Sequence, residues 1–136
     1  MAAKSSTRRK AASPAWAVLK FGGTSVSSVE RWETIAALVR QRLAEGLRPV
    51  VVHSALATVS NKLDELLHRA LEMDVTAQVA GIRELHLRLA AGLQVDGEKE
   101  LGGYFRELEQ LLAGIHLIRE VSPRIQARVM GLGELM

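Results

Sequence analysis

Apolar residues along the chain follow two spacings, one typical of strands and one typical of helices. Residues 15–21 form a short, nearly continuous apolar run, which predicts a buried strand. Residues 29–43 carry apolar side chains every three or four positions, which predicts a helix that Gly46 ends. A second apolar run, residues 50–54, follows Pro49. Strand, helix and strand within about 40 residues predict a βαβ unit with parallel strands.

The rest of the chain has a helical pattern. Apolar residues at helical spacing predict three helices, over residues 61–71, 76–92 and 101–115. Ser122-Pro123 is a cap followed by proline at the first helical position, and predicts a last helix that ends near Met130. Gly131-Leu132-Gly133-Glu134 should interrupt this helix as a turn. The apolar pair that follows, Leu135-Met136, leads us to expect a piece of a longer chain.

Two helix starts are predicted from polar residues. Ser27 and Glu30 have the spacing of a capping box, in which each side chain bonds the backbone N–H of the other residue. Thr76 should cap the helix over residues 76–92 in a simpler way. Asp96-Gly97 is expected to form a turn before the next helix.

Composition narrows the class of protein. An apolar share of 48% supports a core, and an aromatic share of 4% means that this core is mostly aliphatic. The absence of cysteine excludes disulfides and thiolate metal sites. No stretch reaches the roughly 18 apolar residues of a membrane span. A cytoplasmic protein is the expectation.

The net charge of +3 is unevenly distributed along the chain. Residues 1–15 contain four basic residues and no acidic one, so the remainder carries about one negative charge. The first segment has too few apolar residues to fold alone, and we expect a disordered basic tail. A transit peptide or a weak nucleic-acid-binding arm is the alternative for this tail.

The end of the first strand is a candidate anion site. Gly22-Gly23 allows close approach of a ligand to the backbone, and the helix start that follows presents N–H groups to an anion. Lys20 would bring an ammonium group to the same anion. The alternative is an ordinary strand-to-helix turn with an extended lysine side chain. The Gly-Lys-Ser/Thr phosphate loop and the G-x-G-x-x-G fingerprint are both absent.

The end of the second strand should face the same site, because the carboxyl ends of parallel strands meet at one sheet edge. Residues 54–61 are rich in hydroxyl groups that suit a polar substrate. The alternative is that Ser60 or Asn61 only caps the next helix. Glu134 is either a solvated acid or the carboxylate that holds a substrate ammonium group.

The four histidines lack the mutual spacing of metal ligands. His68 and His86 fall on amphipathic helices, and we expect them at the surface or its boundary. His53 sits in an apolar strand and is expected to be a hydrogen-bonded core or boundary imidazole rather than a catalytic base. A nucleophilic pair of His53 with Ser54 is excluded, because adjacent strand residues point to opposite faces.

Three stretches together resemble the motifs of aspartokinases, within the amino-acid kinase family. Lys20–Val26, with the sequence KFGGTSV, resembles the opening motif. Val51–Ala55 through Ser60-Asn61 is similar to the second motif, usually a valine-rich strand followed by Ser-Ala, a glycine and then Val-Thr-Asn. Gly131–Met136 resembles the third, a Gly-Glu turn. The three occur in the family's order, and the resemblance covers residues 16–136.

This resemblance implies a three-layer α/β/α amino-acid kinase-like fold. Residues 16–136 would be its N-terminal part, a βαβ unit followed by several helices, truncated after Met136 and inactive alone. The implied reaction is ATP-dependent phosphorylation of the L-aspartate side-chain carboxylate to 4-phospho-L-aspartate, a step in lysine, threonine and methionine biosynthesis. ATP would enter with Mg²⁺. The complete enzyme would be a homo-oligomer without nucleic-acid or membrane partners, either monofunctional or fused to homoserine dehydrogenase or diaminopimelate decarboxylase.

The resemblance also implies roles for individual residues. Lys20 would be catalytic, neutralising the transferring phosphoryl group. Ser60 and Glu134 would bind aspartate, with Glu134 on its α-ammonium group, and no metal ligand is implied. The residues implied to bind ATP or its phosphates are Lys20, Gly22, Gly23, Thr24, Ser25 and Ser54.

The sequence departs from the family pattern at three positions. His53 stands where an apolar residue is common, Thr58 where glycine is usual, and Ser60 where threonine is usual. Serine for threonine keeps the hydroxyl group. Thr58 is expected to narrow the aspartate pocket or to shift its backbone.

Two other functions are compatible with the residues. One is a small α/β binding or interaction module whose active feature is the basic tail. The other is a glutamate or acetylglutamate kinase, enzymes that share the Lys-x-Gly-Gly pattern of the first motif but not its Thr-Ser-Val continuation.

Overall fold

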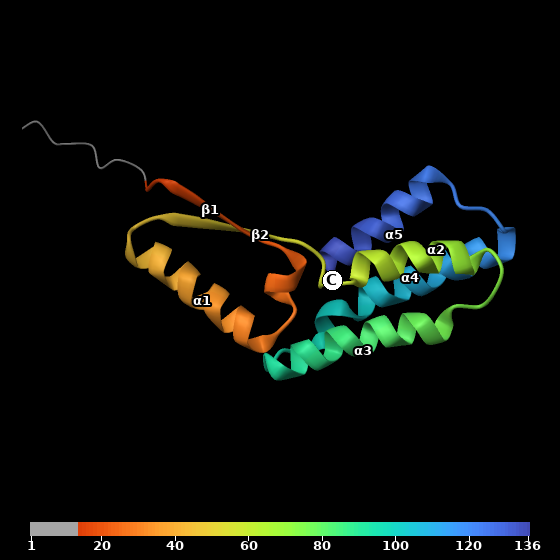
Figure 1. The fold of residues 1–136 in the computed structure, drawn as a ribbon, viewed down its shortest axis with the longest axis horizontal. Helices are drawn as coiled ribbons and strands as arrows, with labels where there is room; N and C mark the ends of the chain where they lie inside the picture. The colour runs from red at the N-terminus through yellow and green to blue at the C-terminus, as the bar shows by residue number, and fades with distance from the viewer. Residues whose placement is uncertain (1–13) are drawn as a thin grey trace, which may run out of the picture.

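The computed structural model describes residues 14–136, so the predicted basic tail, residues 1–15, lies almost entirely outside the described residues. A βαβ unit occupies one end of the molecule and four helices occupy the other (Figure 1). The elements are β1 (Trp16–Phe21), the 3₁₀ turn η1 (Gly23–Val26), α1 (Val29–Ala44), β2 (Arg48–His53), α2 (Val59–Ala70), α3 (Thr76–Gly92), α4 (Gly97–Ile118) and α5 (Pro123–Leu135).

The two strands pair in parallel, as the βαβ pattern predicts. The register runs from Trp16 opposite Arg48 to Phe21 opposite His53. The strands are not buried, however, and that part of the prediction is wrong. Trp16 and Val18 are 67% and 68% exposed. Helix α1 covers the other face of the sheet, and no element of the described chain covers the face that carries these two side chains.

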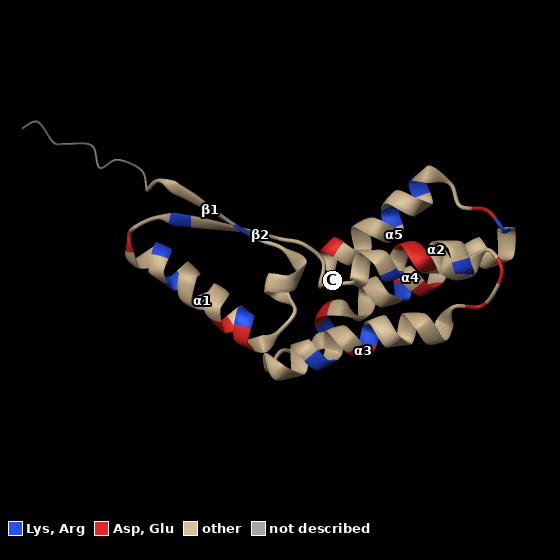
Figure 2. Cartoon of the chain, viewed as in Figure 1, with Lys and Arg blue, Asp and Glu red and all other residues tan. Residues whose placement is uncertain are grey.

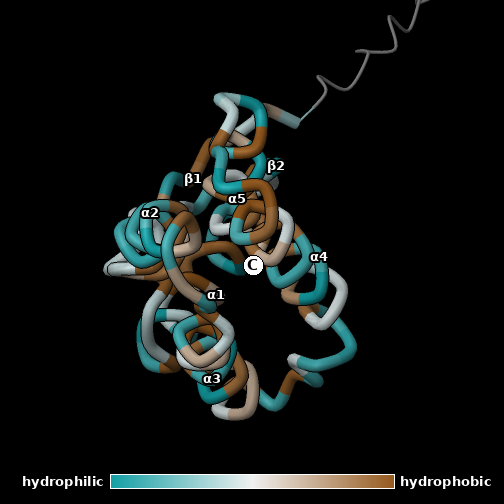
Figure 3. Tube along the Cα trace, turned by 90° about the vertical axis from the view of Figure 1, so that its right-hand side faces the viewer, coloured by the Kyte–Doolittle hydropathy of each residue, from teal (hydrophilic) through white to brown (hydrophobic). Residues whose placement is uncertain are grey.

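Most of the buried apolar side chains lie between α2, α3, α4 and α5. Leu63, Phe105, Leu108 and Ile115 are fully buried in this cluster. Apolar and polar stretches alternate along each helix, as Figure 3 shows. Burying one such side chain contributes about 1.5–3 kcal/mol, so the stability of the chain resides mainly in these four helices.

The helix starts differ in detail from the prediction. Ser28, not Ser27, caps α1, and its hydroxyl accepts from the Arg31 N–H at 3.4 Å. At the start of α3 the N-cap position is Val75, not Thr76, and the Asp74 carboxylate before it accepts from the N–H and the hydroxyl of Thr76. Asp96 caps α4, so the predicted Asp96-Gly97 turn is a helix start.

Helix α5 starts as predicted but ends later. The Ser122 hydroxyl caps it, and the helix continues to Leu135, so the turn predicted at residues 131–134 is wrong. A Cβ built at Gly133 would lie 2.8 Å from Cδ1 of Leu63 on α2. This glycine therefore permits close contact of two helices, and the packing outweighs its low helix propensity.

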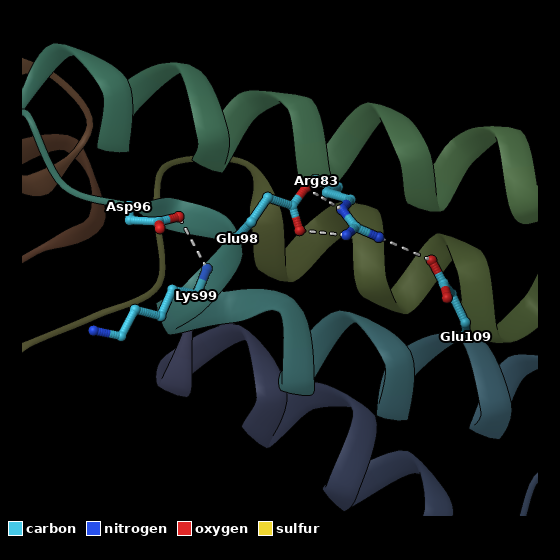
Figure 4. A network of polar contacts seen from close by, with 5 residues as sticks. All are labelled: Arg83, Asp96, Glu98, Lys99 and Glu109. Carbon is cyan, nitrogen blue, oxygen red and sulfur yellow. Dashed lines mark hydrogen bonds and ion pairs between the residues drawn. The ribbon is translucent and has the colours of Figure 1, made fainter.

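Charged residues of both signs lie on the outside of the helices and connect them (Figure 2). Arg83 on α3 pairs with Glu98 and, at 3.6 Å, with Glu109, both on α4 (Figure 4). Arg128 on α5 donates two hydrogen bonds to Glu107 on α4, one to each carboxylate oxygen. These pairs connect neighbouring helices at their solvent-facing edges.

Candidate active site

The carboxyl ends of the two strands meet, as the parallel arrangement predicts. The Ser54 N–H donates to the Phe21 carbonyl at 3.1 Å, which extends the pairing by one residue beyond the sheet. The chain then enters η1 after β1 and the residue 54–58 loop after β2. These two segments are thereby adjacent at one edge of the sheet.

The two glycines of the first motif have different surroundings. A Cβ built at Gly23 would lie 2.6 Å from the Ala55 carbonyl oxygen and 3.3 Å from the Ala57 nitrogen. At Gly22 it would meet nothing within 4 Å, and the backbone φ of −80° suits any residue. The close backbone approach therefore requires glycine at position 23 only.

Ser27 connects the same two segments, a role that the sequence did not predict. Its hydroxyl donates to the Gly23 carbonyl at 2.6 Å and accepts from the Ala57 N–H at 2.8 Å. Assigning the helix cap to Ser27 instead of Ser28 concealed this role. The consecutive serines were the available signal, because only one of them can be the cap.

Glu134 reaches the same loop from α5. One of its carboxylate oxygens accepts from the Ala55 N–H at 3.0 Å. The Ala55 carbonyl oxygen thus lies close to Gly23 of the first motif, and the Ala55 N–H bonds Glu134 of the third motif. All three sequence motifs converge on this residue, although Glu134 lies in the last turn of a helix and not in the predicted turn.

The residues of the second motif sit at the start of α2. Ser54 and Ser60 are half-buried, and Ser60 is the second residue of the helix. The residue at the N-cap position is Thr58, which makes no side-chain cap bond, so the predicted capping by Ser60 or Asn61 is wrong. Thr58 has a φ of +73°, a left-handed conformation that a β-branched residue adopts only under strain.

Lys20 and Thr24 lie at the rim of this arrangement, and both are exposed. Lys20 is opposite Val52 in the register and shares the open face of the sheet with Val18. The turn after β1 runs from Gly22 to Ser25 and is closed by the Ser25 N–H, which donates to the Gly22 carbonyl at 2.9 Å. Lys20 thus carries a positive charge near the carboxyl end of β1, and Glu134 brings a carboxylate to the loop after β2.

Two of the predicted histidine environments are corrected by the structure. His53 is hydrogen-bonded as predicted, with Nδ1 3.2 Å from the Ser54 carbonyl oxygen, but it is exposed. Its ring stands edge-on to Trp32, with 6.0 Å between ring centres. His86 is buried, not at the surface, with 3% of its area exposed. The signal that would have found it is its spacing, since it continues the apolar stripe of Val79 and Ile82 along α3.

A parallel strand pair, a glycine turn and a carboxylate from a distant helix thus meet at one edge of the sheet. The sequence pattern of the amino acid kinase family matches residues 15–127, and the chain belongs to this family. No helix in residues 14–136 has the length and apolar character needed to cross a bilayer.

Within the family, the similar proteins are aspartokinases. The chain is 39% identical over 127 residues to aspartokinase 2 and 36% identical over 124 residues to aspartokinase 3, both chloroplastic enzymes of Arabidopsis thaliana. Each alignment covers 88% of this chain and 22% of the relative. The chain thus spans about a fifth of their length.

A solved structure shows the same relationship. The crystal structure of E. coli aspartokinase III in complex with aspartate and ADP superposes with a TM-score of 0.72 at 25% identity. The match covers 89% of this chain and 26% of that one. The α/β amino-acid kinase-like fold inferred from the motifs is confirmed, with the described chain supplying the N-terminal part of it.

Proposed function

We propose that this chain supplies the phosphate-binding and aspartate-binding ends of the catalytic site of an aspartate kinase. The reaction would be transfer of the ATP γ-phosphoryl group to the side-chain carboxylate of L-aspartate. The observation that carries the proposal is the convergence of the first and third motifs on Ala55. Relatives named aspartokinase align with nearly the whole chain and so support it.

The phosphate end would be built around Gly23. Its close contact with the residue 55–57 loop fixes the turn, and the N–H groups of Gly22 and Gly23 are the donors proposed for phosphate oxygens. Lys20 would add a positive charge from the strand end, with the Thr24, Ser25 and Ser54 hydroxyls nearby. Phosphoryl transfer is promoted mainly by positioning and charge, which these groups offer. Mg²⁺ would enter bound to the ATP phosphates.

The aspartate end would be built around Glu134 and Ser60. The Ala55 N–H holds one Glu134 oxygen at 3.0 Å, which fixes the direction of the carboxylate. A carboxylate fixed in this way is suited to an ammonium group, and the Ser60 hydroxyl to the substrate carboxylate. Thr58, two residues before Ser60, would influence the backbone of this end through its left-handed conformation.

The proposal extends to the organisation of the complete enzyme. Residues 16–136 would be the N-terminal part of a catalytic domain whose remaining part holds the adenine end of ATP. The complete enzyme would be a homo-oligomer in the cytoplasm. Residues 1–15 would be a tail outside the catalytic domain, and we assign it no part in catalysis.

The test uses the complete enzyme chain and the rate of aspartate-dependent ADP formation. Lys20→Ala should lower turnover by about 10²-fold or more, since positioned charges in phosphoryl and acyl transfer contribute at least this much. Lys62→Ala, an exposed lysine on α2, is the matched control and should leave turnover unchanged. Thermal unfolding should show that both variants fold. Near wild-type turnover of Lys20→Ala would contradict the proposal.

Glu134 is tested with two variants. Glu134→Gln keeps an oxygen for the Ala55 N–H but loses the charge, whereas Glu134→Ala loses both. If Glu134 binds the aspartate ammonium group, both variants should raise the KM for aspartate about tenfold or more and leave the KM for ATP nearly unchanged. An unchanged aspartate KM in Glu134→Gln would reduce Glu134 to a structural contact.

A further inference from the structure

One exposed hydroxyl group joins the glycine turn after β1 to the loop before α2. Oγ of Ser27 donates to the Gly23 carbonyl oxygen at 2.6 Å and accepts from the Ala57 N–H at 2.8 Å. Ser27 lies between η1 and α1, and the cap of α1 is supplied by Ser28. The Ser27 hydroxyl therefore makes a contact across 30 positions of the chain and does not serve its own helix.

The two bonds hold this hydroxyl group in one orientation. A hydroxyl group has one hydrogen to donate and lone pairs that accept. The two roles cannot be exchanged here, because a carbonyl oxygen can only accept and a backbone N–H can only donate. Ser27 thus bridges two backbone groups of opposite kind from two different segments.

The Gly23 carbonyl belongs to the peptide group that joins Gly23 to Thr24. A trans peptide is planar, so its C=O and its N–H point in opposite directions. Holding the carbonyl therefore also fixes the direction of the Thr24 N–H. Both residues belong to the proposed phosphate end, so the bridge controls how this turn is presented to a phosphate.

The close contact at Gly23 does not fix this orientation by itself. A Cβ built there would lie 2.6 Å from the Ala55 carbonyl oxygen, so the glycine permits the two backbones to approach. That approach limits the distance between the segments, whereas a hydrogen bond also sets a direction. Ser27 supplies two such bonds.

We propose that Ser27 is a positioning residue of the phosphate end. Its hydroxyl group holds the Gly23–Thr24 peptide in the orientation that phosphoryl transfer requires and does not itself touch the substrate. This inference rests on the proposed aspartate kinase function. A small displacement of positioned groups can lower a rate strongly, so loss of the bridge should affect catalysis and not only stability.

The test uses the complete enzyme chain and the rate of aspartate-dependent ADP formation. Ser27→Ala removes both bonds and should lower kcat/KM for ATP by about tenfold or more, with the KM for aspartate changed by less than about twofold. Ser27→Thr keeps the hydroxyl group and should stay within about threefold of the wild type. Ser27→Cys has a weaker donor and acceptor and should lie between these two variants, which keeps the test decisive where Ser27→Ala unfolds the enzyme.

The next residue is the matched control. Ser28→Ala removes the hydroxyl group that accepts from the Arg31 N–H, so it weakens the start of α1 and leaves the bridge intact. Both alanine variants should lower the midpoint of thermal unfolding, but only Ser27→Ala should lower kcat/KM for ATP. Equal effects of the two variants on kcat/KM would show that Ser27 is merely structural and would overturn the inference.

Lys20→Ala, measured in the same assay, separates this inference from the proposed function. If Lys20→Ala loses turnover and Ser27→Ala keeps its kcat/KM for ATP, the positioning role is overturned and the proposed function stands. If Lys20→Ala retains turnover, the phosphate end is overturned and the role of Ser27 with it. An aspartate KM that rises as much as the ATP KM in Ser27→Ala would also overturn the inference, because the whole loop would then have been displaced.

Discussion

The βαβ unit and the four-helix region differ in how well they are packed. The helices share one continuous core in which residues such as Leu63 and Phe105 are fully buried. In the βαβ unit, Val26 and Ile35 are the buried side chains of η1 and α1, and one sheet face is open. Most of the phosphate end of the proposed site, nevertheless, belongs to the βαβ unit.

This difference shows that the better-packed part of the chain and the proposed phosphate end are largely separate, whereas Ser60 and Glu134 of the proposed aspartate end lie on α2 and α5. The contacts that join the two parts are few and specific. Ser27 and Gly23 hold the loop before α2, and Glu134 holds that loop from α5. The geometry of the proposed site thus depends on a well-packed helical region that holds a more open sheet edge in place.

The largest expected effect comes from truncating the helical core. Leu63→Ala should lower the free energy of unfolding by about 2–5 kcal/mol, because it leaves a cavity in a fully buried position. Leu43→Ala is the matched change on α1, where the side chain is 56% exposed, and should cost less than about 1 kcal/mol. Urea unfolding of both variants measures the difference. Equal losses would show that the two regions are stabilised alike.

The next effect concerns the contact between the regions. Gly23→Ala should cost about 1–3 kcal/mol, because the new Cβ meets the Ala55 carbonyl oxygen in the backbone of the loop. The Ala57 amide donates to the Ser27 hydroxyl, and its hydrogen exchange should be faster in Gly23→Ala than in the wild type. Gly22→Ala is the control and should leave both unchanged, since its Cβ enters open space. An unchanged Ala57 exchange rate in Gly23→Ala would show that the contact between Gly23 and Ala55 does not hold this loop in place.

A smaller effect, of opposite sign, is expected at the strained start of α2. Thr58→Gly should raise the free energy of unfolding by about 1 kcal/mol, because glycine adopts a φ of +73° without the penalty of a β-branched residue. Gln94, which follows α3, has a φ of +59° but is not β-branched. Gln94→Gly should therefore raise the free energy of unfolding by less than Thr58→Gly. Thermal unfolding of the two variants measures which of them gains more stability. A loss of stability in Thr58→Gly would mean that its side chain makes a compensating contact.

The smallest effect is the acid sensitivity of the helical region. The Arg128 guanidinium bonds Glu107 and lowers the pKa of its carboxyl group in the folded chain. The stabilisation is therefore complete above the unfolded pKa of about 4.3 and is lost as the pH falls through the lower folded value.

Glu107→Gln should accordingly show a shallower loss of stability as the pH falls below the unfolded pKa of about 4.3. Glu33→Gln, an exposed carboxylate on α1, removes the same charge and serves as the control. Urea midpoints as a function of pH provide the measurement. The same slope in wild type and Glu107→Gln would argue against a stabilising pair.

The helices and the βαβ unit were predictable from local patterns, because apolar spacing determines which face of an element is buried. The meeting of Gly22-Gly23 with the loop after β2 was predictable too, since parallel strands end at one edge. The end of α5 was not, because the contact of Gly133 with Leu63 is tertiary and overrides the glycine signal. Nothing local indicated that the Glu134 carboxylate bonds the Ala55 N–H.

The Ala55–Glu134 hydrogen bond also has a consequence for the order of folding. Its two residues are separated by 79 positions, so closing this contact has a large entropic cost that only the assembled helices offset. During synthesis, β1, α1 and β2 emerge first and can pair early. The carboxylate that meets their edge emerges some 80 residues later. We therefore expect the sheet edge to become a complete site only as a final event, after α2–α5 have docked.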